Sequence, residues 1–126
     1  MHHAEICIIT KIIEDYFLLV DGNHPKYELI PITQQIDNVI YSVGVIIKRK
    51  LLNGYLYIEV KGENEDSNDS TFSYSLSDNN DNYLESIEIT YGGYFSENVR
   101  NAVRRILILD KEQSKCPKDS IELKHY

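Results

Sequence analysis

Residues 62–99 read GENEDSNDSTFSYSLSDNNDNYLESIEITYGGYFSENV. This stretch holds nine acidic residues and no lysine or arginine, so its formal charge is −9. The whole chain carries −7, and the other 88 residues (126 − 38) therefore sum to +2 (−7 + 9). We interpret the chain as organised around this acidic stretch, which contains a loop, a pair of strands and the start of a helix.

The middle of the stretch has the pattern of two antiparallel strands. From Thr71 to Ser77, apolar side chains alternate without exception with hydroxyl side chains. This alternation is typical of a strand with one face in water. Residues 78–82 tolerate left-handed backbone and predict a turn. Residues 83–91 are then the returning strand, with Glu88 and Thr90 facing outward.

The two ends of the stretch differ in character. The acidic loop 62–70 has no apolar residue, so it cannot be buried. At the other end Gly92-Gly93 closes the sheet, and Ser96 is a good helix N-cap. The apolar residues from Val99 to Leu107 have helical spacing. The sequence therefore predicts a C-terminal helix at about 97–109, followed by a polar tail at 114–126.

The N-terminal half predicts further strands. Residues 5–13 are β-branched and apolar on both sides, as in a central strand, and 16–20 and 26–32 suit two more. Segment 34–41 fits both a short helix and an extended run. Asn53-Gly54 is the preferred dipeptide of a two-residue type I′ hairpin turn. In that register Leu52 is opposite Tyr55, and Lys48 is opposite Glu59.

These elements predict one domain over residues 1–126. The class is α+β and mainly antiparallel β, with strands followed by a helix. We expect about seven strands in one curved sheet or open barrel, one C-terminal helix, and a possible short helix at 34–41.

The overall charge limits the classes of partner that this chain is expected to bind. A pI near 5.0 argues against nucleic-acid binding and against docking on anionic lipid, since both need lysine and arginine. The sequence shows no signal peptide and no apolar run of membrane-spanning length, so the expected compartment is the cytoplasm. Acidity favours a basic protein partner, or solubility alone.

No catalytic, metal or cofactor motif is present in the sequence. The four histidines and two cysteines lack the second pair of closely spaced ligands that closed zinc sites use. Two segments, from Asp66 and from Asp78, begin like calcium loops, but neither has glycine at the sixth position or glutamate at the twelfth. Arg100, Arg104 and Arg105 are expected to pair with the protein's own acids. We therefore expect no cofactor, no metal and no enzyme activity.

The acidic strand pair is the candidate recognition surface. Its carboxylates would steer a basic protein, and its tyrosines would supply rigid contact area. We expect a small cytoplasmic binding protein that neutralises a basic partner by occlusion, most concretely an immunity protein that inhibits a bacterial toxin nuclease. The alternatives are a ligand-binding or regulatory β-domain with a barrel-mouth pocket, and an enzyme with a carboxylate pair. The expected partner-binding residues are Glu63, Glu65, Asp66, Asp69, Tyr74, Asp78, Asp81, Tyr83, Glu85 and Glu88.

Overall fold

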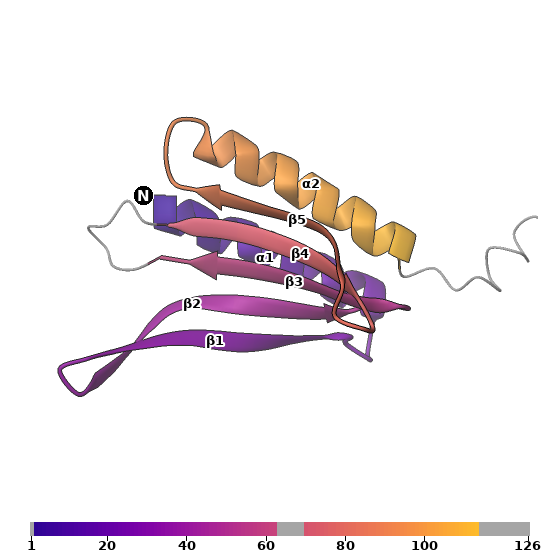
Figure 1. The fold of residues 1–126 in the computed structure, drawn as a ribbon, viewed down its shortest axis with the longest axis horizontal. Coiled ribbons are helices and arrows are strands. Elements are labelled where there is room, and N and C mark those ends of the chain that lie inside the picture. The colour runs from indigo at the N-terminus through magenta and orange to yellow at the C-terminus, as the bar shows by residue number, and fades with distance from the viewer. Residues whose placement is uncertain (1, 63–69, 114–126) are drawn as a thin grey trace, which may run out of the picture.

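The computed structural model describes residues 2–62 and 70–113, which form two helices and one five-stranded sheet (Figure 1). The strands lie side by side in chain order, and every neighbouring pair is antiparallel. The predicted α+β class is confirmed, but the sheet is open and has five strands rather than seven. The elements are α1 (His2–Asp21), β1 (Tyr27–Ile36), β2 (Val39–Lys50), β3 (Gly54–Lys61), β4 (Thr71–Asp78), β5 (Tyr83–Thr90) and α2 (Phe95–Gln113).

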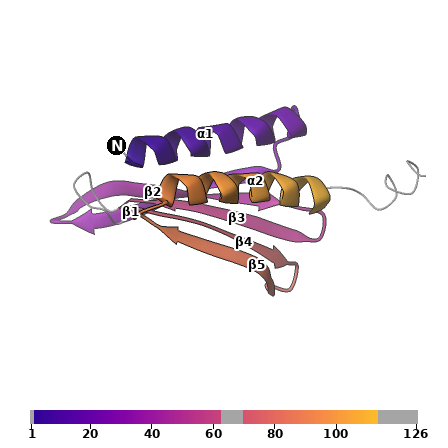
Figure 2. The same cartoon turned by 90° about the horizontal axis from the view of Figure 1, so that it is seen from above.

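Both helices lie on the same side of the sheet (Figure 2). We call this side the covered face. Its core joins Ile13 and Phe17 of α1, Val99 and Ile106 of α2, and alternate residues of β2, β3 and β4 such as Ile58. In the described part of the chain no helix covers the other side, which we call the open face. By strand alternation and pairing, β2 to β5 present on it Ile46, Lys48, Lys50, Tyr55, Tyr57, Glu59, Lys61, Thr71, Ser73, Ser75, Ser77, Tyr83, Ser86, Glu88 and Thr90.

The N-terminal segment is helix α1, so the strands predicted at 5–13 and 16–20 are wrong. Its core-facing residues Ile9, Ile13 and Phe17 recur every four positions, which is helical spacing. Tertiary packing overrides the strand preference of its isoleucines. A second apolar set on the exposed side hides this spacing in the sequence: Ile8 (61% exposed), Ile12 (53%) and Leu19 (80%).

The segment from 34 to 41 is the end of the β1–β2 hairpin, so the short helix expected there is wrong. Ile36 pairs with Val39, and Asp37 and Asn38 between them have φ values of 51° and 66°. Two positive φ values in a two-residue loop define the type I′ turn that Asn and Asp tolerate. The end of this hairpin extends beyond the other strands, and its apolar side chains are therefore exposed (Figure 1).

The β2–β3 hairpin exists as predicted, but its turn and register differ. Lys50 pairs with Tyr55, and the Leu51 amide donates to the Gly54 carbonyl at 2.9 Å. The loop residues are therefore Leu52 and Asn53, and neither has a positive φ. The pairing moves by two residues, which preserves the sorting of side chains between the faces. Lys48 consequently stands opposite Tyr57 and not opposite Glu59.

The C-terminal half follows the prediction closely. Strands β4 and β5 span the predicted alternating segments, and α2 begins two residues before and ends four residues after the predicted 97–109. Its buried stripe includes Val99, Ala102 and Ile106. The acidic loop 62–70 lies outside the described residues except for Gly62 and Ser70, and the tail 114–126 lies wholly outside them.

A buried arginine connects the two helices to the sheet. Arg49 of β2 is 2% exposed and packs its guanidinium 4.4 Å from the centre of the Phe17 ring. Its Nε donates to Oδ1 of Asp110 in α2 at 2.9 Å, and its Nη1 donates to Asp21 at the end of α1. Burial alone would raise the pKa of Asp21, but the hydrogen bonds from Arg49 and from the Lys26 amide lower it. A single guanidinium therefore ties α1, β2 and α2 together.

Candidate binding face

Strand β4 gives the open face a floor of small hydroxyl side chains. Its residues alternate between the core residues Phe72, Tyr74 and Leu76 and the open-face column Thr71, Ser73, Ser75 and Ser77. Strict alternation puts all the hydroxyls on one side because successive strand residues point to opposite faces. The serine side chains are short, so the middle of the open face is lower than the strands beside it.

Larger side chains from β3 and β5 stand on either side of this floor. Across the three strands, Glu59 pairs with Ser73 and Ser73 with Glu88. Two rows further along β4, Tyr55 pairs with Ser77 and Ser77 with Tyr83. The result is a hollow of about 290 Å³ on the open face. It is lined by Ile46, Tyr57, Glu59, Ser73, Ser75, Ser77, Asp81 and Tyr83.

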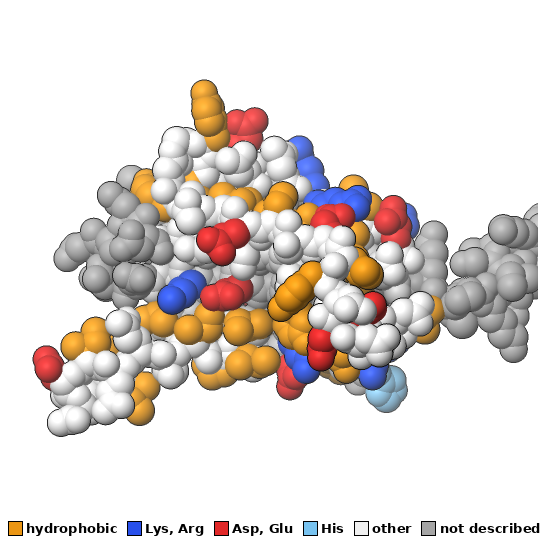
Figure 3. Space-filling model, in the orientation of Figure 1, with side chains coloured by type: hydrophobic (Ala, Val, Ile, Leu, Met, Phe, Trp, Pro, Cys, Tyr) orange, Lys and Arg blue, Asp and Glu red, His pale blue; other side chains and the backbone are white. Residues whose placement is uncertain are grey.

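The lining of this hollow has a negative charge. It includes the carboxylates of Glu59 and Asp81 and no lysine or arginine. Among the described residues, neither carboxylate forms an ion pair or a side-chain hydrogen bond. In the space-filling view, acidic side chains and a basic side chain lie close together in the middle of this face (Figure 3). The hollow therefore offers free acceptors to a positively charged group.

One hydroxyl in the lining lacks a partner. Ser77 is 2% exposed, and its Oγ has no hydrogen-bond partner among the described residues. Buried polar groups in native proteins are nearly always satisfied, so this hydroxyl is available for a further hydrogen bond. Because Oγ of Ser77 can both donate and accept, it suits a ligand with N–H or O–H groups.

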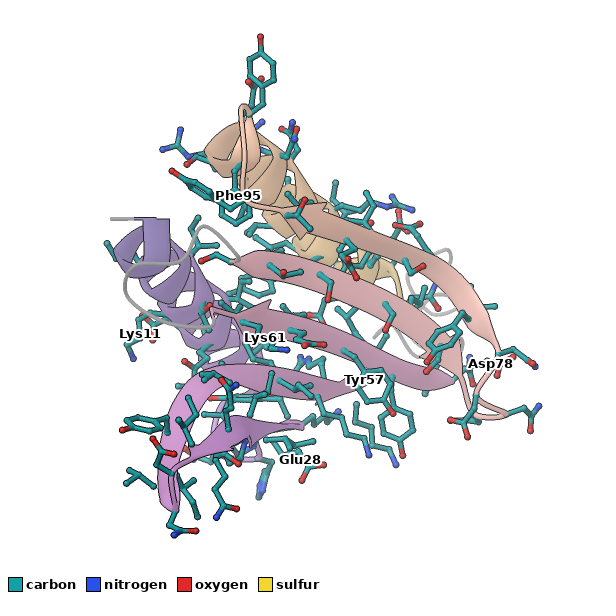
Figure 4. All side chains as sticks on the ribbon, turned by 60° about the vertical axis from the view of Figure 1, so that its left-hand side comes forward. Lys11, Glu28, Tyr57, Lys61, Asp78 and Phe95 are labelled. Carbon is teal, nitrogen blue, oxygen red and sulfur yellow. The ribbon has the colours of Figure 1, made fainter. Side chains whose placement is uncertain are left out.

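Lysines also lie on the open face: Lys48 and Lys50 of β2 are opposite Tyr57 and Tyr55, and Lys61 is two residues from Glu59 in β3. Lys48 has its Nζ 3.8 Å from Oε1 of Glu28 and 4.7 Å from the centre of the Tyr55 ring. Its charge is therefore already in contact with a carboxylate and an aromatic ring. The stick view shows Tyr57 and Lys61 on β3, and Glu28 on β1 beyond β2 (Figure 4). Glu59 is opposite Ile46 and is therefore a diagonal neighbour of Lys48, but among the described residues no ion pair joins them.

The structure divides the predicted recognition residues between the two faces. Tyr74 is buried on the covered face, where its hydroxyl donates to Oε2 of Glu85 at 2.6 Å. Arg105 of α2 binds the same carboxylate through Nε at 2.9 Å and Nη2 at 2.8 Å. Arg105 thus pairs with an acid of the chain, as expected. Tyr74 and Glu85 lie on the side opposite the hollow, so the predicted residues do not share one surface.

This cluster shifts two pKa values strongly. The hydrogen bonds from Arg105 and Tyr74 lower the pKa of Glu85 to about 2. Burial, together with the hydrogen bond to Glu85, raises the pKa of Tyr74 to about 12. Both shifts favour the ionised carboxylate and the neutral phenol, which is the pairing that the geometry shows. The three side chains form a structural link between β4, β5 and α2.

The remaining predicted residues fall into two groups. Asp78 accepts hydrogen bonds from the Asn80 and Asn82 amides at 2.8 and 3.0 Å, which lower its pKa and hold the β4–β5 turn. Asp81, in that turn at φ 62°, and Tyr83 line the hollow, and Glu88 stands beside it. The other four residues, Glu63, Glu65, Asp66 and Asp69, lie outside the described residues.

Sequence reasoning missed Tyr57 and Glu59 as site residues. The two-residue register error assigned Glu59 to Lys48, which made its carboxylate look occupied. The alternation Tyr55-x-Tyr57-x-Glu59 in β3, facing the hydroxyl column of β4, was the signal that identifies them. In the correct register, Tyr57 and Glu59 stand opposite Ser75 and Ser73 of the hydroxyl column.

The other features of the described residues give less support for a binding site. A second hollow of about 560 Å³ lies near Arg49, but that arginine is already bound by Asp21 and Asp110. Within residues 2–62 and 70–113, no three potential ligands gather as a metal site. Neither α1 nor α2, as far as they are described, combines the length and hydropathy that a bilayer-spanning helix requires.

Comparisons with protein-family models, curated proteins and solved structures each find no match for this chain.

Proposed function

We propose that this chain is a binding protein that neutralises a basic protein partner by occlusion, using the open face of its sheet. The observation that carries the proposal is the hollow on that face, which has two acids and two tyrosines in its lining and no basic residue. Exposed tyrosines beside free carboxylates match the composition of residues that dominate protein interfaces. The most concrete case is an immunity protein that blocks a bacterial toxin nuclease.

Occlusion follows from the chemistry of such a partner. A nuclease holds the phosphates of its substrate with lysine and arginine side chains. These cations also bind carboxylates. Glu59, Asp81 and Glu88 would occupy these cations and exclude the nucleic acid. Long-range attraction between the acidic face and a basic groove would also raise the association rate, by about 10 to 1000-fold at low salt.

A ligand-binding β-domain is the weaker candidate. The open sheet has no barrel mouth, which was the pocket expected for that function. The hollow of about 290 Å³ lies at the lower end of the roughly 300–1,000 Å³ that small-molecule sites occupy. Its lining is also mainly polar, whereas such sites are mainly apolar.

The test is affinity capture from the source cells with the full chain and two charge-reversed variants. Glu59→Lys/Glu88→Lys alters the open face, and Asp15→Lys/Glu112→Lys makes the same charge change on exposed helix positions. We expect the wild type and the helix variant to capture the same basic protein, and the open-face variant to lose it. The association rate of the open-face variant should fall about tenfold or more at low salt, and less at high salt.

Equal capture by both variants, or a partner without a basic surface, would overturn the proposal. If the captured protein cleaves nucleic acid, the same three forms of the chain are added to the cleavage assay. Inhibition by the wild type and the helix variant alone is the expected result.

A further inference from the structure

We propose that the hollow on the open face is an anchor site for a single arginine side chain of the partner. This inference rests on the proposed function and specifies its central contact. It starts from the orphan Ser77 hydroxyl, which is buried at the floor of the hollow without a partner among the described residues. The occupant must therefore bring at least one hydrogen-bonding group to this floor.

The charge of the lining selects a cation. Glu59 and Asp81 both line the hollow, and no described residue pairs with either carboxylate. Glu88 stands one strand away from the floor, opposite Ser73. A neutral occupant would leave these acids without compensation, and an anionic occupant would be repelled. The hollow therefore takes the positively charged end of a side chain.

The tyrosines that line the hollow favour a planar cation. Tyr57 of β3 and Tyr83 of β5 line the hollow from opposite sides of the serine column. A guanidinium is flat, stacks on aromatic faces and carries five N–H donors in a fixed fork. Those donors suit the acceptors that line the hollow, which are the Glu59 carboxylate at the Ser73 end, the Asp81 carboxylate in the β4–β5 turn, and the serine hydroxyls between them. An ammonium is a point charge with three donors and gains less from such walls.

A contact between a cation and aromatic rings already exists within the protein, beside the hollow. The Lys48 ammonium lies 4.7 Å from the centre of the Tyr55 ring and 5.9 Å from that of Tyr57. Both distances are within the range in which a cation is attracted by an aromatic ring. Lys48 belongs to the β2 side and does not line the hollow, so it leaves the floor above Ser75 and Ser77 available.

The test is a titration of the isotope-labelled full chain with N-acetyl-arginine amide, followed by the backbone amide signals in nuclear magnetic resonance. N-acetyl-lysine amide has the same charge, and N-acetyl-citrulline amide has nearly the shape of the arginine probe without the charge. We expect the arginine probe to shift the signals of residues 73–77, Tyr57 and Tyr83. The lysine probe should bind about threefold or more weakly, and the citrulline probe should give no saturable shift.

Variants then assign the contacts. Glu59→Gln should weaken the arginine probe about tenfold, and Ser77→Ala about threefold. Glu112→Gln is the control, because Glu112 is an exposed carboxylate of α2 on the opposite side of the sheet. It should leave the affinity unchanged. Shifts located elsewhere, equal binding of citrulline, or full affinity in the Glu59 and Ser77 variants would each overturn the assignment.

These outcomes are separable from those of the capture experiment. Arginine binding in the hollow, with no basic protein captured, overturns the proposed function and supports the site. A basic partner that needs Glu88 but is indifferent to Glu59→Gln and Ser77→Ala supports the function and overturns the site.

Discussion

On the covered face, the charged groups described above have partners, whereas on the open face Glu59, Asp81 and Glu88 have none among the described residues. Arg49 is bound by two carboxylates, and Glu85 is bound by Arg105 and Tyr74. The two faces share the same strands, so the difference does not come from backbone geometry. Apart from the Lys48–Glu28 pair, the described charged groups of this sheet thus stabilise the fold on the covered face, and the acids Glu59, Asp81 and Glu88 stay available on the open face.

The largest effect is expected on the covered face, from Arg49→Met. This change leaves the buried carboxylates of Asp21 and Asp110 without their cation, and breaking a buried ion cluster in this way costs about 3–5 kcal/mol. The free energy of unfolding, measured with urea, should fall by that amount. Lys48→Met, one residue away in the same strand, is the control and should cost less than about 1 kcal/mol. Similar losses for both variants would show that the Arg49 cluster does not hold the helices.

A smaller effect is expected at the edge of the covered face, from Glu85→Gln. The pKa of Glu85 is about 2 in the folded protein and about 4.3 in the unfolded chain. The ionised carboxylate therefore contributes its full stabilisation above pH about 4.3. We expect the wild type to exceed the variant by about 1 kcal/mol at pH 7. This advantage should disappear as the pH falls from about 4.3 to 2.

The measurement is urea unfolding of both proteins at several pH values between 2 and 7. The difference between them isolates Glu85, because the other shifted acids, Asp21 and Asp78, are present in both proteins. A difference that stays constant over the whole range would contradict the assignment of the Glu85 ion pair.

The smallest effect has the opposite sign and belongs to the open face. Ser77→Ala removes a buried hydroxyl that has no partner among the described residues, so the free energy of unfolding should rise by up to about 1 kcal/mol. Ser75→Ala removes a partly exposed hydroxyl from the same column and should change stability by less than about 0.5 kcal/mol. Thermal or urea unfolding measures both. A clear loss of stability in Ser77→Ala would mean that its hydroxyl is satisfied within the fold.

The sequence predicted the second half of the fold well, for a physical reason. Residues 71–77 have one wet and one dry face, and alternation then shows both the strand and its orientation. In β5 the alternation is also present, although Ile87 on the covered side is 45% exposed. In α1 and at the end of the β1–β2 hairpin, apolar residues such as Ile12 and Ile40 are exposed, so apolar spacing no longer reports burial. The Asp37-Asn38 turn was overlooked because its neighbours also fit a helical repeat.

The site was partly predictable. The hydroxyl column of β4 and the outward position of Glu88 follow from alternation alone. Whether an acid is free depends on neighbours across strands and helices, and spacing cannot show this: Arg105 reaches Glu85 from 20 positions away. Tyr74 was misjudged for the same reason, since alternation gives its face but not the helix that covers it.

The strand order β1-β2-β3-β4-β5 has a consequence for contact order. Neighbouring strands are also consecutive in the chain, so sheet pairing requires little closure of long loops, which is a property of rapidly folding domains. The helix contacts are the exception: α1 packs with α2 in the core, and the Arg49 cluster joins Asp21 to Asp110 across 89 positions (28 + 61). Pairing in the sheet is therefore local in the chain, while the core contacts of the helices and the Arg49 guanidinium form the non-local part. The last ligand of this guanidinium belongs to α2, the final described segment to leave the ribosome.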